Sequence, residues 1–222
     1  MTDVWSVLMF LGSSVCHQLP ERSYFLGDLQ MPLCARCTGI HLGLLVSATF
    51  LMMGPFRFRS GLPTVKQMIV LGAFMSMFFI DAGLSYSGIS ESTNLRRTVS
   101  GLMFGVLLPF LFVPLLNLLV FPKRDDRRIL ETPLAWAWPI ALSGVSAGLI
   151  YAAQSLDAAF YAASLLGLVG MFVTFSLIVS CLVLIGFEKS TASSRTKIAF
   201  AVTIAVSALL AVASAREVLA AG

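Results

Sequence analysis

The sequence predicts an all-α integral membrane protein, a helical bundle of about six transmembrane helices that is preceded by a short N-terminal helix and a loop containing cysteine and histidine. Two observations on composition predict this class. Of the 222 residues, 58% are hydrophobic and only 12% are charged, and the mean hydropathy is +0.90. Soluble domains carry about a quarter charged residues. In addition, the apolar residues form long uninterrupted stretches, which is typical of segments whose solvent is lipid.

Six stretches are long enough to cross a bilayer, which needs about 20 apolar residues. We expect spans near 38–56, 67–86, 98–121, 134–153, 158–187 and 198–216. The apolar stretch 4–15 would extend only about 18 Å as a helix, so we expect it to be interfacial or re-entrant. The chain thus divides into an N-terminal motif segment, 1–37, and a transmembrane bundle, 38–222.

Small residues and prolines predict how the spans pack. Glycines four apart let helix backbones approach closely in lipid, and prolines inside a span predict kinks. The glycine pairs are Gly39/Gly43, Gly101/Gly105 and Gly144/Gly148, and the prolines are Pro109, Pro114 and Pro139.

The distribution of Lys and Arg predicts the orientation. The loops 57–66, 122–133 and 188–197 hold ten of these residues, whereas the opposite side holds five. The positive-inside rule places the richer side in the cytoplasm, so the N-terminal motif faces outward. The net charge of +4 therefore indicates topology and gives no support for nucleic-acid binding.

A compact cysteine and histidine cluster stands near the N-terminus. It consists of Cys16, His17, Cys34 and Cys37. A Cys-x-x-Cys pair lets two thiolates reach one metal ion, zinc or iron, and more distant ligands complete the tetrahedron. His41, one helical turn after Cys37, is a rival to His17 as the fourth ligand. The alternatives are a disulfide or redox-active pair, which an outward-facing loop permits, and unlinked thiols.

The fourth cysteine and two acidic residues complete the candidate set. Cys181 lies alone in an apolar span and is expected to be a small core residue. Glu21 is either a helix-start residue paired with Arg22, or a general acid or base. Asp81 lies inside an expected span, where a charge is costly, and is either a catalytic residue or an ion-pair partner of an arginine.

Arginines near the start of the third span predict an anion site. Asn94, Arg96 and Arg97 lie at the expected start of a helix. Free backbone N–H groups and hydroxyls at a helix start bind anions together with such arginines. Arg22 and Arg36 lie on the same expected side of the membrane. We predict that these five residues bind an anionic ligand, although interfacial snorkelling is the simpler interpretation of any single arginine.

These motifs resemble one known family. The matching residues are Cys16-His17-Gln18, Pro20-Glu21-Arg22-Ser23, Pro32, Cys34-Ala35-Arg36-Cys37-Thr38-Gly39 and Asn94…Arg97…Gly101. They resemble the domain of unknown function 2085 family of small prokaryotic membrane proteins, densely over 16–43 and more weakly through 81–105. The resemblance implies a prokaryotic cell (inner) membrane. His41 departs from the aromatic residue expected there, which argues against its being a ligand throughout the family.

The predicted function combines a metal site with an anion pocket. We expect a membrane enzyme or binding protein for an anionic lipid or lipid phosphate, because all candidate polar residues fall on one membrane face. A thiol–disulfide or electron-transfer protein is one alternative, and a transporter of small solutes or ions is another. A purely structural metal knot is the fourth hypothesis. Oligomeric state is not predicted.

Overall fold

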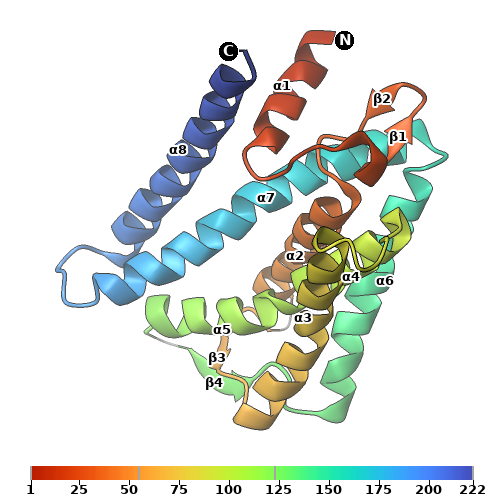
Figure 1. Ribbon diagram of the computed structural model, residues 1–222. Helices are drawn as coiled ribbons and strands as arrows, with labels where there is room; N and C mark the ends of the chain where they lie inside the picture. The colour runs from red at the N-terminus through yellow and green to blue at the C-terminus, as the bar shows by residue number, and fades with distance from the viewer. Residues whose placement is uncertain (1, 55, 123, 222) are drawn as a thin grey trace.

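The computed structural model describes residues 2–54, 56–122 and 124–221 (Figure 1). The elements in chain order are α1 (Thr2–Ser13), the 3-10 helix η1 (Pro20–Arg22), β1 (Phe25–Leu26), β2 (Leu29–Gln30), α2 (Ala35–Met53), β3 (Arg59–Gly61), α3 (Val65–Tyr86), α4 (Asn94–Leu107), α5 (Pro109–Val120), β4 (Asp125–Arg128), the 3-10 helix η2 (Pro133–Trp136), α6 (Ala137–Ala152), α7 (Asp157–Gly186) and α8 (Ser194–Ala221).

Six helical segments of the described chain are long and apolar enough to cross a membrane. They are Ala35–Met53, Val65–Tyr86, Asn94–Val120, Pro133–Ala152, Asp157–Gly186 and Ser194–Leu219. Each overlaps a span that the sequence predicts, with shifts of a few residues at the ends. The prediction of an all-α membrane bundle is therefore confirmed.

The first span begins earlier than predicted. Helix α2 starts at Ala35 with Cys34 as its N-cap residue. Arg36 and Cys37 consequently lie in the first turn of a membrane helix and not in a preceding loop. The boundary drawn at 37/38 thus cuts through α2.

Glycines bring α2 and α4 into close contact. A Cβ atom at Gly101 would lie 2.3 Å from the carbonyl oxygen of Arg36, and one at Gly105 would lie 2.0 Å from that of Ile40. From the other side, a Cβ at Gly39 would lie 2.6 Å from the carbonyl oxygen of Thr98. No side chain fits in this interface, so the backbones cross in contact. The prediction is confirmed for these two glycine pairs.

The third glycine pair does not mediate a helix contact. A Cβ atom at Gly144 or Gly148 would meet nothing within 4 Å. The prediction of close approach was wrong here, because these glycines of α6 face away from the neighbouring helices.

Proline divides the third span into two helices. Helix α4 ends at Leu107, and α5 begins at Pro109, whose missing N–H is tolerated in a first helical turn. Leu108 keeps helical dihedral angles, so the two helices form one bent span. Pro114 lies inside α5 and Pro139 lies in the first turn of α6.

Two short sheets, which the sequence did not predict, lie in the connections between the helices. Strands β1 and β2 pair antiparallel, Phe25 opposite Gln30, within the N-terminal motif. Strands β3 and β4 pair in parallel at the other end of the bundle. The buried amide of Asn117 donates to the carbonyl oxygens of Arg57 and Arg59 and so holds β3 against α5.

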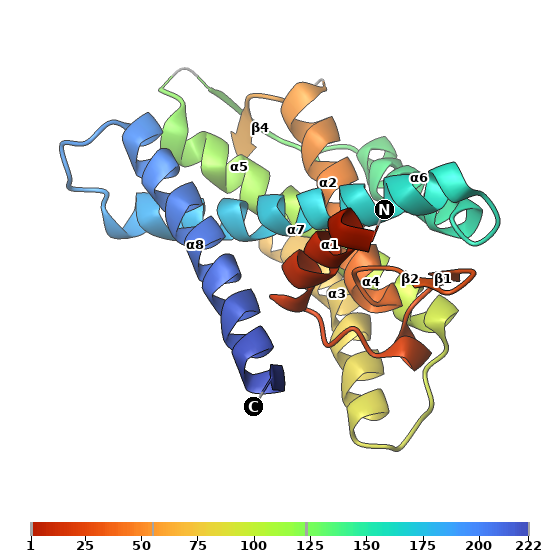
Figure 2. The same ribbon diagram turned by 90° about the horizontal axis from the view of Figure 1, so that it is seen from above.

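The long helix α7 runs across the molecule, and α8 lies at the edge of the bundle next to α7 and α1 (Figure 2). The twelve-residue helix α1 is shorter than a span, and its interfacial or re-entrant placement stays a prediction. Its Trp5 ring stacks on Phe160 with 5.7 Å between centroids.

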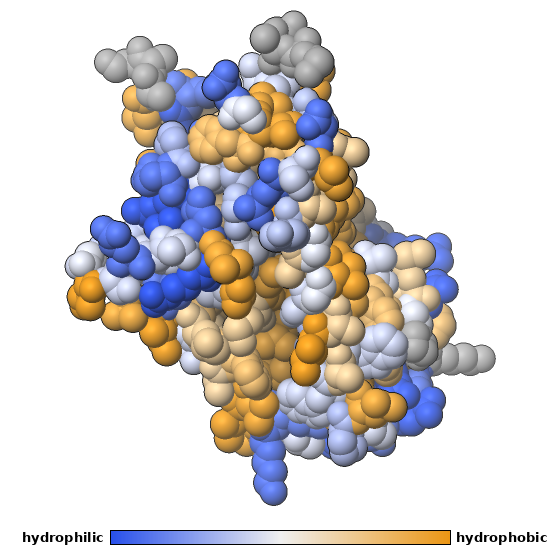
Figure 3. Space-filling model, turned by 90° about the vertical axis from the view of Figure 1, so that its right-hand side faces the viewer, coloured by the Kyte–Doolittle hydropathy of each residue, from blue (hydrophilic) through white to orange (hydrophobic). Residues whose placement is uncertain are grey.

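Polar and apolar residues separate along the molecule. In the view of Figure 3, hydrophobic residues cover most of the face between a hydrophilic upper region and hydrophilic residues at the lower end. In Figure 2 the loop between α3 and α4, the C-terminus and the chain from α1 to β1 lie toward the lower end, whereas β4 and the loop between α7 and α8 lie toward the upper left. This agrees with the grouping of loops predicted from charge. One residue counted in that prediction, Lys123, lies outside the described residues.

Candidate functional site

Three cysteine thiols converge at the start of α2. The Sγ atoms of Cys16, Cys34 and Cys37 all lie within 4.8 Å of one another, and none forms a disulfide. Cys16 is buried, and the other two are partly buried. Cys34 and Cys37 come from the N-cap and the first turn of α2, where the helix dipole favours thiolates. Cys16 reaches them from the turn after α1.

Backbone N–H groups fix the Cys16 sulfur. The N–H of Cys34 donates to Cys16 Sγ at 3.1 Å, and the N–H of Gln18 donates to it at 3.4 Å. Gln18 has a φ of +54°, in the left-handed region that few residues other than glycine adopt. Its side-chain amide donates to the carbonyl oxygens of Met9 at 2.7 Å and Pro32 at 2.9 Å. These bonds hold the chain in a turn that points two donors at one sulfur.

The three thiols share one environment. Hydrogen bonds from the thiols of Cys16 and Cys37 hold the pKa of Cys34 well below its usual value. The same hydrogen bond with Cys34, together with burial, raises the pKa of Cys16. The cluster therefore favours a thiolate at Cys34, the form in which cysteine binds metals.

The thiol cluster fits zinc or iron. Both metals accept three or four thiolates from a Cys-x-x-Cys pair and distant cysteines. The three sulfur atoms lie within 4.8 Å of one another, so they could hold one ion together, and the two chain segments that carry them are fixed by hydrogen bonds. Such a centre would supply a Lewis acid next to the cavity described below.

Neither histidine belongs to the close group of ligand atoms. His17 is exposed and lies at the rim of the cavity beside the cluster. His41 is buried, and its Nδ1 lies 3.0 Å from the hydroxyl of Thr174 on α7. The fourth ligand therefore stays a prediction, with His17 the candidate that lines the same cavity as the sulfurs.

A cavity of about 190 Å³ adjoins the thiols. It is lined by polar residues from the N-terminal motif, α2 and α4 and by apolar residues of α2 and α3. The polar lining includes Cys16, His17, Gln18, Arg22, Cys34, Arg36, Cys37 and Arg97. The structure thus brings together seven residues that the sequence singled out, from segments up to 81 positions apart.

Two arginines of this cavity are buried with unused donors. Arg36 is 7% exposed and Arg97 is 8% exposed. The Nε of each is buried without a hydrogen-bond partner. Arg97 donates to the side-chain oxygen of Asn94 at 3.2 Å, and it has no acidic partner among the described residues. A buried charge without a counterion is costly, so this cavity favours an anion.

Arg22 and Asn94 have structural contacts as well. Arg22 lies over the ring of Tyr86, with 5.4 Å to the centroid, and 3.6 Å from the carboxylate of Glu21. The amide of Asn94 donates to the carbonyl oxygen of Ser23 at 3.1 Å, which ties the N-terminal motif to α4. Asn94 positions Arg97 but does not line the cavity.

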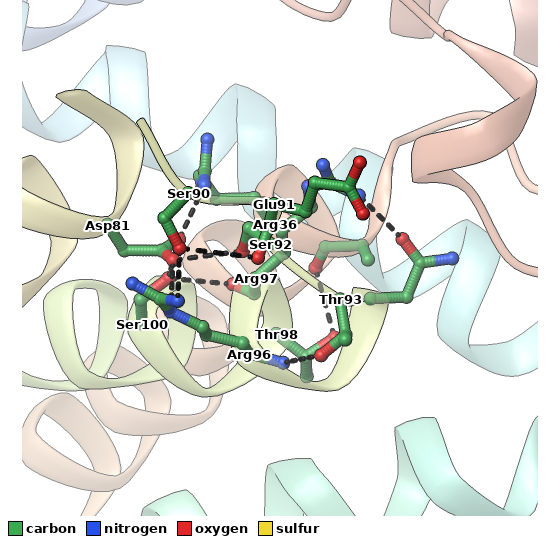
Figure 4. Close-up of polar contacts among 12 residues, drawn as sticks. Arg36, Asp81, Ser90, Glu91, Ser92, Thr93, Arg96, Arg97, Thr98 and Ser100 are labelled. Carbon is green, nitrogen blue, oxygen red and sulfur yellow. Dashed lines mark hydrogen bonds and ion pairs between the residues drawn. The ribbon is translucent and has the colours of Figure 1, made fainter. Parts of the chain in front are cut away.

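Asp81 is the centre of a buried polar network (Figure 4). Its Oδ2 accepts from Arg36 at 2.5 Å and from the hydroxyl of Ser100 at 3.1 Å. Its Oδ1 accepts from Ser92 at 2.9 Å and lies 2.8 Å from Arg96. This agrees with the interpretation of Asp81 as an ion-pair partner. The carboxylate orients Arg36 toward the cavity and is already occupied by four donors.

The remaining predicted residues lie apart from the cavity. Arg96, whose side chain is 45% exposed, pairs with Asp81 and lines a different cavity. Glu21 is in the first turn of η1 with an exposed side chain, which fits its interpretation as a helix-start residue. Neither it nor Asp81 lines the cavity. Cys181 is buried alone in α7, as predicted.

Sequence reasoning missed several residues that build the site. Gln18 turns the chain at Cys16, and the amide of Gln30 donates to the carbonyl oxygen of Gln18 at 2.7 Å. Ser92 and Ser100 complete the Asp81 network. Gln18 falls within the matched Cys-His-Gln motif, which was the one signal for it. The two serines carried none, because a serine in a loop or inside a helix is common and marks no site by itself.

Fold and site together define a multi-pass helical membrane protein with a cysteine and arginine cavity at one end of its bundle. Residues 16–111 match the family described as "Predicted membrane protein (DUF2085)". This match confirms the resemblance to that family seen in the motifs of the chain. The matched region contains the three clustered cysteines and all the arginines of the cavity.

Two archaeal proteins are similar to this chain. The uncharacterized protein MJ1492 of Methanocaldococcus jannaschii is 29% identical over 111 residues, which are 50% of this chain and 69% of that protein. An uncharacterized protein of Methanothermobacter thermautotrophicus is 29% identical over 92 residues, 41% of this chain and 78% of its own. No solved structure matches the chain.

Proposed function

We propose that this protein binds zinc or iron through Cys16, Cys34 and Cys37 and an anionic lipid headgroup, such as a lipid phosphate, in the adjoining arginine cavity. One observation carries the proposal: a single cavity is lined both by the three thiols and by arginines whose buried Nε atoms have no partner. A phosphate group offers several acceptor oxygens and suits arginine in geometry and charge.

The charges near the cavity support an anionic ligand. Arg22, Arg36 and Arg97 line it, while the carboxylate of Asp81 is divided between Arg36 and Arg96. The excess positive charge would be offset by a phosphate-type anion together with a metal–thiolate centre. Apolar side chains of Ile40 and Phe78 form another part of the lining, as a ligand with an apolar portion would require.

Binding is favoured over catalysis. The two carboxylates proposed as catalytic groups, Glu21 and Asp81, do not line the cavity. A bound metal would polarise a phosphoryl or carbonyl oxygen. The residues of the chain itself would hold and orient the anion through the three arginines.

The cavity is proposed to face the outside of a prokaryotic cell (inner) membrane. The support is the excess of Lys and Arg in the loops at the opposite end of the bundle. Cysteine substitutions at Ser87 and Ser190, which are exposed at opposite ends of the bundle, test this with a membrane-impermeant maleimide. Whole cells should label Ser87→Cys, but not Ser190→Cys, above the background of the native cysteines. The reverse pattern would contradict the orientation.

Elemental analysis tests the metal. Purified wild-type protein should contain zinc or iron, and Cys34→Ser should lose most of it. Cys181→Ser is the matched control, because this cysteine is buried apart from the cluster in α7 and should leave the metal content unchanged. Equal and negligible metal in all three proteins would refute the metal site.

Binding of a short-chain lipid phosphate tests the anion site. Dihexanoyl phosphatidic acid should bind Arg97→Gln at least about tenfold more weakly than wild type, since a hydrogen bond to a charged group contributes about 1.5–3 kcal/mol. Arg195→Gln, which changes an exposed arginine in the first turn of α8, is the control and should bind as wild type does. Equal binding by all three proteins would contradict the proposal.

The close approach of three free thiols also favours thiol–disulfide exchange as a second candidate. Alkylation of the cysteines distinguishes a metal centre from a disulfide. A metal centre predicts that labelling increases with a chelator, whereas a disulfide predicts that it increases with a reductant. If chelation unfolds the protein, the metal has a structural role.

A further inference from the structure

A second, larger cavity lies beside α1. It measures about 730 Å³, within the range of pockets that enclose small molecules. Its walls are predominantly apolar and come from α1, β2 and α7, while α8 contributes the acidic residue Glu217; the apolar lining includes Trp5, Leu8, Met9, Phe10, Tyr161 and Leu165. Figures 1 and 2 show α1 beside α7 with α8 at the edge of the bundle. We call this cavity the α1 groove.

The α1 groove adjoins the arginine cavity at Gln18. This residue lines both hollows. Its amide is fixed to Met9 on the groove side and to Pro32 next to the thiols, while its N–H donates to Cys16. One ordered residue therefore separates a charged hollow from an apolar one.

We propose that the α1 groove holds the hydrocarbon chain of the same lipid whose anionic head occupies the arginine cavity. This inference rests on the proposed function and adds the chemistry of the ligand: a phosphate-type head followed directly by a long apolar chain. The juxtaposition supports it, because a head held by Arg36 and Arg97 leaves its chain beside Gln18, where the apolar lining begins.

The α1 groove contributes to lipid binding by packing closely against the hydrocarbon chain. The bilayer is as apolar as the groove, so transfer of a chain between them gains little hydrophobic free energy. Packing against the ring of Trp5, which is itself fixed by a hydrogen bond from Nε1 to the carbonyl oxygen of Gln30 at 3.0 Å, orders the chain instead. The groove should therefore select where the chain lies more than how tightly the lipid binds.

Photolabelling tests this placement. The full-length protein is placed in phosphatidylcholine nanodiscs with phosphatidic acid that carries a diazirine in its acyl chain, and labelled peptides are mapped by mass spectrometry. Labels should concentrate on α1 and on 161–165, several-fold above the lipid-exposed part of α7 around Leu182. A phosphatidylcholine probe with the same diazirine should show no such enrichment.

Two variants make the test specific. Leu165→Trp fills the groove and should remove the enrichment on α1, whereas Leu182→Trp, on the same helix at a lipid-exposed position, should preserve it. Arg97→Gln should reduce labelling in the groove to the level of the phosphatidylcholine probe.

The outcomes separate the two proposals. Uniform labelling, or enrichment that persists in Arg97→Gln, would overturn the chain placement, because bulk lipid would then explain it. If dihexanoyl phosphatidic acid binding still depends on Arg97, the proposed function survives that result. If binding is independent of Arg97 as well, both proposals fail.

Discussion

Replacing Asp81 with asparagine keeps the shape of a buried side chain and removes its charge. Asp81 is 4% exposed and accepts from Arg36, Ser92 and Ser100 while pairing with Arg96. The loss leaves the buried guanidinium of Arg36 without a counterion. We expect the network to open and α3 to separate from the start of α4.

The expected loss of stability follows from the burial of the ion pair between Arg36 and Asp81. Removing one partner of a buried ion pair costs about 3–5 kcal/mol. The pair with Arg96 adds less than about 1 kcal/mol, because the Arg96 side chain is 45% exposed and screened by solvent. We therefore expect Asp81→Asn to lower the free energy of unfolding by about 3–5 kcal/mol.

Unfolding by sodium dodecyl sulfate in mixed micelles, followed by circular dichroism, measures this difference. Glu91→Gln is the control, because its exposed carboxylate lies in the loop between α3 and α4, and it should change stability by less than about 0.5 kcal/mol. The double variant Arg36→Gln/Asp81→Asn should lose less than the sum of the two single variants. A loss below about 1 kcal/mol for Asp81→Asn, or full additivity, would refute the buried network as a stabilising element.

Two other predictions concern packing and charge. Gly105→Ala should destabilise the protein by about 1–3 kcal/mol in the same assay, because the added Cβ would lie 2.0 Å from the carbonyl oxygen of Ile40. Gly148→Ala, which adds a Cβ into open space, should be neutral; equal effects would contradict the contact between α2 and α4. Hydrogen bonds from Arg127 lower the pKa of Asp125 from 3.8 to about 2. Asp125 should therefore stabilise the folded state above pH 3.8 and lose this effect as the pH falls to about 2. Asp125→Asn should accordingly be less stable than wild type at about pH 5, and the two proteins should become equally stable as the pH falls to about 2. A difference in stability that stays the same over this pH range would contradict the lowered pKa of Asp125.

Local sequence patterns predicted many residues of the candidate site. The Cys-x-x-Cys pair and Cys16 were predicted to share a metal, and their sulfurs do lie together. Arg22, Arg36 and Arg97 were predicted on one face, and they line one cavity. The partners of these residues could not be predicted. Two examples are the pairing of Arg36 with Asp81 and the absence of Arg96 from the cavity lining. Both depend on the rotation of helices, which no local pattern encodes.

Lipid as a solvent explains the division between what the sequence determined and what it left open. Every backbone group in a span must be hydrogen-bonded within its own helix, so the apolar runs determined the class of protein, the spans and their order. Lipid gives helices no hydrophobic reason to choose one neighbour over another. The tertiary structure alone therefore decided that Gly101 and Gly105 face α2 while Gly144 and Gly148 face outward. It also decided that Gln18 stands between a charged cavity and an apolar one, because contact geometry is set by packing between segments far apart in the chain.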